Sequence, residues 1–138
     1  MREIGSMSRA RENPARPADP RVALGRAAEE AAARHLDGLG WETLARNVRL
    51  CGAEIDLVMR DGDTIVFVEV RSRSRRAHGG PLETVGPTKQ ARIARAAAAF
   101  LSRAGLGAAP ARFDVVGVDW RQGEPALEHV RHAFESPP

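Results

Sequence analysis

The sequence predicts a single α/β domain whose central sheet is covered by helices on both sides. Two neighbouring stretches, 54–60 and 64–71, are apolar on both faces, which is typical of buried central strands. Helical spacing of apolar residues flanks them, in 20–39 and in 87–104. With 138 residues, the chain is long enough for one core and short for two. The expected order of elements is therefore αβββαβ, followed by one edge strand.

The first helix is expected where a polar N-terminal segment ends. Residues 1–18 are arginine-rich and lack a repeating apolar face, so we expect a disordered tail followed by one domain at 19–138. Asp19 and Pro20 are typical of a helix N-terminus, and Gly40 is typical of its end. The expected buried face of this helix comprises Leu24, Ala28, Ala31, Ala32, His35, Leu36 and Leu39.

Turn residues and alternation define the remaining segments. A surface loop is expected where Arg, Ser and Gly replace apolar residues, and strands are expected where apolar and polar residues alternate. In chain order, these segments are a short strand at 41–46, an irregular basic stretch at 47–52, a hairpin turn at 61–63, a surface loop at 72–86, and strands at 112–120 and 127–134.

Composition narrows the partners of the protein. Of the 21 Lys and Arg residues only Lys89 is a lysine, so the net charge of +3 rests almost entirely on arginine. Arginine pairs bidentately with phosphate, which is compatible with a nucleic-acid partner. A GC-rich genome would give the same abundance of arginine and alanine, so composition leaves both explanations open.

Several classes of protein are disfavoured. The single cysteine, Cys51, excludes an intramolecular disulfide and a thiolate metal cage. No apolar run approaches the roughly 20 residues of a membrane span and no signal sequence is evident, so we expect a cytoplasmic protein without a membrane partner. Four Phe, two Trp and no Tyr offer few platforms for stacking bases, which disfavours single-strand recognition.

Asp56 and Glu69 interrupt the two central strands, and the loop between these strands decides whether they meet. A two-residue loop at 62–63 places the two carboxylates directly opposite each other, and a loop at 61–62 places them diagonally on one face. A three-residue loop would separate them onto opposite faces. The turn residues favour a loop of two.

Two carboxylates between apolar neighbours repel each other, and a divalent cation with oxygen ligands relieves that repulsion. Mg²⁺ or Mn²⁺ held by Asp56 and Glu69 can activate water for phosphodiester cleavage. The alternative is a pair of solvated surface acids, but Glu69 interrupts the apolar run IVFVEV, which argues against exposure. Arg71 shares a face with Glu69, where it either clamps phosphate or neutralises the glutamate.

Three motifs carry a resemblance to a known family: EIDL at 54–57, FVEVRSR at 67–73 and RFDVV at 112–116. Through them the chain resembles the YraN family, which is similar in pattern to the PD-(D/E)xK nuclease superfamily and distantly to archaeal Holliday-junction resolvases. The resemblance implies a restriction-endonuclease-like three-layer core of order αβββαβ with a mixed sheet. It also implies a metal held by Asp56 and Glu69, with a glutamate from the first helix.

Glu29 matches the position of that helix glutamate, and the alternative is a solvated helix acid. Two positions depart from the family pattern. Ala53 stands where the family usually has a glycine before Glu54, which bears on the bulge entering the strand. Arg71 stands where the superfamily has lysine, and an arginine cannot readily lose a proton, which puts a general-base role at this position in doubt.

We therefore hypothesise that Lys89 supplies the missing amine from the first turn of the second helix. Lys89-Gln90 also matches a Lys-Gln pair of the family. Together with the free N–H groups of the helix terminus, the two side chains would hold a phosphate. The alternative is an exposed surface lysine.

Other charged residues suggest where nucleic acid would lie. The expected contacts are Arg71, Arg73, Arg75, Arg76, Lys89 and Gln90. Arginines on the outer face of the second helix are more simply explained as a solvated surface. Asp114 is expected in a structural salt bridge with Arg112 rather than in the site.

Two functions from different classes remain. One is a Mg²⁺- or Mn²⁺-dependent endonuclease acting on DNA, branched DNA included, in which Glu29, Asp56, Glu69, Arg71 and Lys89 form the catalytic set. The other is a catalytically inactive module of the same fold that binds nucleic acid. A third, an interaction scaffold, leaves almost no sequence trace. A resolvase of branched DNA would need two sites on symmetric strands, so in that case a homodimer is expected.

Overall fold

The computed structural model describes residues 20–73 and 85–135, so the expected tail at 1–18 lies outside it. The elements are helix α2 (Pro20–Gly38), strands β1 (Glu42–Leu50), β2 (Ala53–Asp61) and β3 (Thr64–Arg73), helix α3 (Pro87–Arg103), and strands β4 (Ala111–Arg121) and β5 (Glu124–Phe134). The fold is thus of the mixed α/β class that the sequence predicts. Neither of these two helices is long and apolar enough to cross a membrane.

The five strands form one mixed sheet in the order β1-β2-β3-β4-β5. Only β3 and β4 are parallel, and the other neighbours are antiparallel. Parallel neighbours need a crossover connection, and α3 supplies it between β3 and β4. Each strand pairs with the strand that precedes or follows it in the chain, so the order of the strands in the sheet is the same as their order in the sequence.

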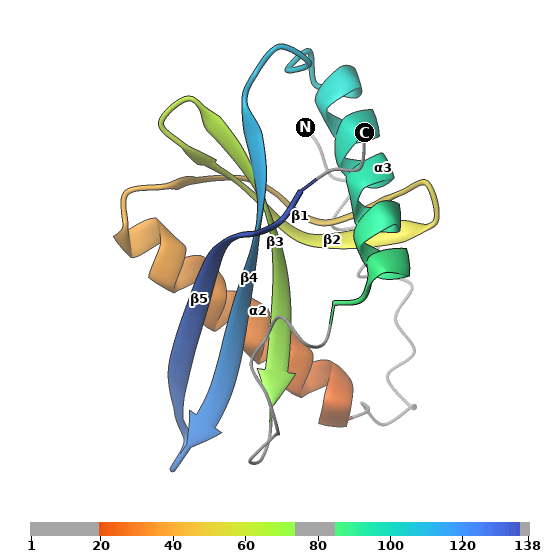
Figure 1. Cartoon of the computed structure of the whole chain (residues 1–138). Coiled ribbons are helices and arrows are strands. Elements are labelled where there is room, and N and C mark those ends of the chain that lie inside the picture. The colour runs from red at the N-terminus through yellow and green to blue at the C-terminus, as the bar shows by residue number, and fades with distance from the viewer. Residues whose placement is uncertain (1–19, 74–84, 136–138) are drawn as a thin grey trace, which may run out of the picture.

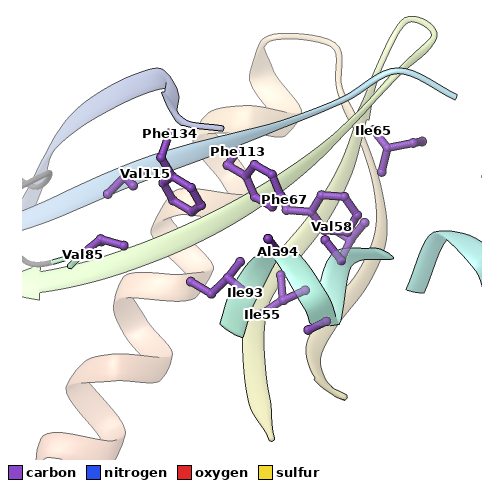
Figure 2. Close-up of a cluster of buried hydrophobic side chains, with 12 residues drawn as sticks. Ile55, Val58, Ile65, Phe67, Val85, Ile93, Ala94, Phe113, Val115 and Phe134 are labelled. Carbon is purple, nitrogen blue, oxygen red and sulfur yellow. The ribbon is translucent and has the colours of Figure 1, made fainter. Parts of the chain in front are cut away.

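The two helices cover opposite faces of the sheet. Figure 1 shows α2 crossing behind β3 and β4, while α3 lies on the viewer's side. On the α3 side, the ring of Phe113 stacks on Phe67 at 5.6 Å and on Phe134 at 4.8 Å between centroids (Figure 2). On the α2 side, the buried residues are mainly alanine and valine: Ala28, Ala32, Ala33, Val66, Val68, Val116 and Val118. The sheet is therefore a middle layer with a separate core on each face.

The buried face of α2 differs in part from the expected one. Ala28, Ala32 and Leu36 are buried as predicted, but His35 and Leu39 are exposed. The buried stripe follows four-residue steps along the helix, which leaves His35 on its outer side, and Leu39 lies beyond the last helical residue. The His35 ring instead meets His129 of β5 edge-on, with 6.1 Å between centroids.

Strand β1 is longer than the sequence indicates. The sequence predicts an irregular stretch at 47–52, yet β1 continues to Leu50, which pairs with Ala53. Cys51 and Gly52 alone form the turn, with φ values of 54° and 76° that fit a two-residue hairpin loop. The second half of the strand escapes prediction because β1 forms an edge of the sheet and is only half-buried, so its polar and basic residues hide the alternation.

Gly25 lies inside α2, where a Cβ would meet no atom within 4 Å. Replacing it with alanine is expected to raise the free energy of unfolding by about 1 kcal/mol, because glycine loses more backbone entropy in a helix interior. Urea denaturation at pH 7 measures this. Gly38→Ala, at the last helical residue, is the control and should have a smaller effect. A lower midpoint for Gly25→Ala would contradict the expectation.

Candidate functional site

The β2–β3 hairpin sets Asp56 and Glu69 against each other. Asp61 pairs with Thr64, so the loop consists of two residues, 62–63, and Gly62 has the positive φ of 63° that its first position requires. The ladder extends to the pair Leu57 and Val68, and the next position in the same register places Asp56 opposite Glu69. The structure thus adopts the first of the two-residue alternatives and not the three-residue loop.

Asp56 occupies the opening where the two strands separate. Its Oδ2 accepts a hydrogen bond of 2.7 Å from the backbone N–H of Val70. Figure 1 shows β3 continuing beside β4, whereas β2 turns away from the shared hairpin toward α3. The side chain of Asp56 therefore bonds to the neighbouring strand, and this bond fixes the position of its carboxylate between β2 and β3.

Glu69 is buried, with 6% of its surface exposed, and two cations contact one of its oxygens. Its Oε2 lies 2.6 Å from Nζ of Lys89 and 3.1 Å from Nη1 of Arg71. Its Oε1 is also buried but has no hydrogen-bond partner among the residues that the structure describes. A buried acceptor without a partner is costly, so this oxygen is suited to a cation or to a donor on a bound ligand.

Burial raises the pKa of Asp56 from 3.8 to about 7, and the negative charge of Glu69 acts in the same direction. The charges of Glu29 and Glu54 add to the increase, while the hydrogen bond from Val70 opposes it. Near neutral pH the carboxyl of Asp56 is therefore divided between its two protonation states. A proton on Asp56 relieves its repulsion with Glu69, and a cation placed between the two carboxylates would relieve the same repulsion.

Glu29 is half-buried on α2, and its carboxylate is hydrogen-bonded to Asn47 rather than to Asp56 or Glu69. Its Oε1 accepts a hydrogen bond of 3.1 Å from Nδ2 of Asn47, and the same nitrogen donates to Glu54 at 3.1 Å. Across residues 20–73 and 85–135, no three His, Cys, Asp or Glu side chains are grouped closely enough to hold one metal ion. The role of Glu29 as a metal ligand consequently stays a prediction.

The side chains of Asp56 and Glu69 nevertheless fit one hard divalent cation. Mg²⁺ commonly binds through one or two carboxylates and completes its shell with water and substrate phosphate. The unpartnered oxygen of Glu69 offers such an ion an acceptor, and the raised pKa of Asp56 marks a carboxyl whose charge is not yet offset. Two carboxylates therefore suffice for this class of site.

Lys89 lies where the sequence predicts it, in the first turn of α3. The helix begins at Pro87 after Gly86, which makes no side-chain capping bond. The Lys89 side chain is 41% exposed while its Nζ contacts Glu69, so it is not an isolated surface lysine. Gln90 instead fixes the turn before the helix, because its Nε2 donates to the carbonyl of Val85 at 2.9 Å.

The remaining predicted contacts are only partly described. Arg71 forms an ion pair with Glu69, which is one of the two roles that the sequence allowed for it. The side chain of Arg71 is still 28% exposed. Arg73 is the last residue of β3, and Arg75 and Arg76 lie outside the described residues. Asp114 is fully buried and contacts Arg112 at 3.0 Å and His129 at 2.8 Å, which confirms the expected salt bridge with Arg112.

Asn47 is the residue at this site that sequence reasoning missed. Its φ of 50° lies in the left-handed region, which asparagine tolerates better than most residues. An asparagine inside a basic stretch assigned to irregular structure gave no sign of joining α2 to β2. Only the pairing of β1 with β2 brings its amide to Glu29 and Glu54.

The fold and the site together define a mixed α/β protein with a carboxylate pair at an open hairpin end, beside a lysine on a helix N-terminus. The family model described as "Uncharacterised protein family UPF0102" matches residues 28–118 of this chain, and the chain belongs to this family. The three sequence motifs at 54–57, 67–73 and 112–116 indicated the same family under the name YraN.

Proteins of this family from several bacteria are similar to this chain over most of their length. A UPF0102 protein of Anaeromyxobacter dehalogenans is 51% identical over 118 residues, which cover 85% of this chain and 87% of the relative. One from Alkalilimnicola ehrlichii is 45% identical over 128 residues, which cover 92% and 98%. Among solved structures, SfsA of Pyrococcus furiosus in complex with Ca²⁺ aligns over 82% of this chain and 64% of its own at 14% identity, with a TM-score of 0.38. That TM-score is too low to support an argument from SfsA.

Proposed function

We propose that this protein is a Mg²⁺- or Mn²⁺-dependent endonuclease that hydrolyses phosphodiester bonds of DNA on a restriction-endonuclease-like core. The observation that carries the proposal is the convergence of Asp56 and Glu69 on the opening between β2 and β3, with one oxygen of Glu69 left without a partner among the described residues. Asp56 and Glu69 would hold the ion. When bound, the ion would activate water and stabilise negative charge on the phosphoryl group.

The side chains around the pair have separable tasks. Arg71 and Lys89 both contact Oε2 of Glu69 and place two positive charges beside it. Because Lys89 is also partly exposed, its ammonium can meet a phosphate oxygen that enters from solvent. The first N–H groups of α3 have no side-chain cap and point out of the N-terminus of the helix. They can therefore donate further hydrogen bonds to that phosphate.

The second candidate is a DNA-binding module of the same fold that does not cleave. The ion pairs on Glu69 favour it, because they neutralise one of the two carboxylates without a metal. Arginine at position 71 in place of lysine favours it as well, since a guanidinium does not lose a proton at ordinary pH. Under this alternative the fold and the phosphate contacts persist without the chemistry.

One assay separates the two. Purified protein is incubated with branched, nicked and linear DNA in Mn²⁺, beside the double variant Asp56→Asn, Glu69→Gln. Cleavage by the parent and none by the variant is the expected result. Equal DNA binding by both proteins, with no cleavage by either, would favour the binding module. Absence of both binding and cleavage in the parent would reject both candidates.

A further inference from the structure

A groove runs along the start of α2 and the β1–β2 hairpin. Its first part has a volume of about 430 Å³ and is lined by Val22, Gly25, Arg26, Glu29, Asn47, Arg49 and Glu54. Its second part has a volume of about 470 Å³ and is lined by residues 49–54 around the turn. The two parts share Arg49 and Glu54 as lining residues, so they adjoin each other at these two side chains.

This groove leads toward the site. Glu29 and Glu54 line it, and both are close enough to Asp56 for their charges to raise its pKa. Asn47 lines it as well and ties these two glutamates together through one amide nitrogen, at 3.1 Å to each. Glu29 and Glu54 therefore form part of the groove wall, where each accepts a hydrogen bond from the neutral amide of Asn47.

The arginines of the groove are more available to a ligand. The side chain of Arg49 is 81% exposed, and it pairs with Glu54 across 3.6 Å between Nη2 and Oε1. Arg26 is exposed and has no ion pair with any residue in the described part of the chain. An exposed ion pair of this length contributes little to stability, so both guanidinium groups can turn to an incoming anion at low cost.

Size and charge together select the occupant. A volume of this order falls within the range of roughly 300–1,000 Å³ that is typical of small-ligand sites, and it suits about one nucleotide in each part. Exposed arginines on the rim favour phosphate, and two adjoining hollows that share Arg49 favour a chain of phosphates over a single free ion. A polynucleotide backbone meets both conditions.

We propose that this groove holds the sugar-phosphate backbone of the DNA strand next to the carboxylate pair, with Arg26 and Arg49 contacting successive phosphates. The proposal rests on the proposed function only in taking DNA as the ligand, and it does not require cleavage. It adds a DNA-contacting surface on α2 and the β1–β2 hairpin to the contacts expected from Lys89 and Arg71. DNA would then pass between this surface and the N-terminus of α3.

Removal of the two guanidinium groups is the first test. Binding of a fluorescent DNA duplex and of a four-way junction is followed by anisotropy at several NaCl concentrations. The Arg26→Ala, Arg49→Ala double variant is expected to bind at least about tenfold more weakly. Its slope of log K against log[NaCl] should be shallower by about two, because each guanidinium neutralises one phosphate. Arg103→Ala, at the far end of α3, should bind as the parent does and is the matched control.

A matched pair at Gly25 provides a second test that does not depend on deleting arginines. Glutamate and glutamine have nearly the same shape, both form helices better than glycine, and a Cβ at this position meets no atom within 4 Å. Gly25→Glu places a negative charge in the groove and is expected to weaken DNA binding about tenfold relative to Gly25→Gln. Both variants should unfold at or above the parent's midpoint, which separates weaker binding from a damaged fold.

The outcomes distinguish this inference from the proposed function. If the parent binds DNA and both sets of variants keep its affinity and salt dependence, the groove is not the DNA path, while the endonuclease proposal stands. If the parent binds no DNA in any of these conditions, the groove and the proposed function fail together.

Discussion

Asp56→Asn is expected to make the protein more stable at pH 8 by up to about 4 kcal/mol and to leave it nearly unchanged at pH 4. The pKa of Asp56 is about 7 in the folded protein and 3.8 without the fold's influence, and each pKa unit corresponds to about 1.36 kcal/mol. Between these two values the folded state binds more protons than the unfolded state, so the free energy of unfolding falls as the pH rises. Above pH 7 Asp56 is ionised in both states, and the full loss of unfolding free energy caused by its buried charge is present.

Asparagine removes this penalty and keeps the local contact. Its side-chain oxygen can still accept the hydrogen bond that Val70 donates to Asp56, and it carries no charge that would repel Glu69. Urea denaturation of the parent and the variant at half-unit steps from pH 4 to pH 8 measures the difference. Asp63→Asn, in the exposed β2–β3 turn, is the control and should leave the pH dependence unchanged. Parallel profiles for the parent and Asp56→Asn would contradict the expectation.

A carboxyl that lowers stability at neutral pH requires a reason for its presence. A structural role would be better met by asparagine, because the bond to Val70 needs only an acceptor. A charge that costs stability and faces a second buried carboxylate is typical of sites that hold a ligand or cation, where stability is given up for function. The stability measurement therefore bears on function without depending on a cleavage assay.

The carboxylate pair could be predicted from sequence because it depends on local rules. Side-chain parity along two strands and the length of one turn decide whether Asp56 and Glu69 share a face, and both can be counted in the sequence. The place of Lys89 followed in the same way, from the helical spacing of apolar residues that predicts a helix at 87–104. The contact between Lys89 and Glu69 depends on the crossover of α3 from β3 to β4, which the order of elements expected from the sequence already contained.

The groove and its two arginines could not be predicted in this way. Arg49 lies on an edge strand whose basic residues resemble irregular chain, so its position opposite Glu54 had no basis in the sequence. Arg26 is one of many arginines on solvated surfaces, and only the packing of α2 beside β1 and β2 sets it apart from the others. Surfaces formed between elements distant in sequence carry no periodic signal, because periodicity reports the buried face of each element alone.

Lys89→Ala is expected to lower the rate of DNA cleavage in Mn²⁺ by about 10² to 10⁴-fold, while DNA affinity changes by less than about tenfold. The Lys89 ammonium lies 2.6 Å from Oε2 of Glu69, closer than the Arg71 guanidinium at 3.1 Å. Its partial exposure lets it reach a phosphate that Arg71 alone would have to neutralise. The free energy of unfolding should change little, because Arg71 remains paired with Glu69 after the substitution.

Two companion variants define what Lys89 does. Lys89→Arg keeps the positive charge but cannot transfer a proton, so recovery of cleavage would assign an electrostatic role, and continued absence of cleavage would assign proton transfer. Arg92→Ala, exposed one turn further along α3, removes a nearby positive charge and should cleave at the parent's rate. Unchanged cleavage and binding by Lys89→Ala would contradict any role for this lysine, and the charge of Glu69 would then be balanced by Arg71.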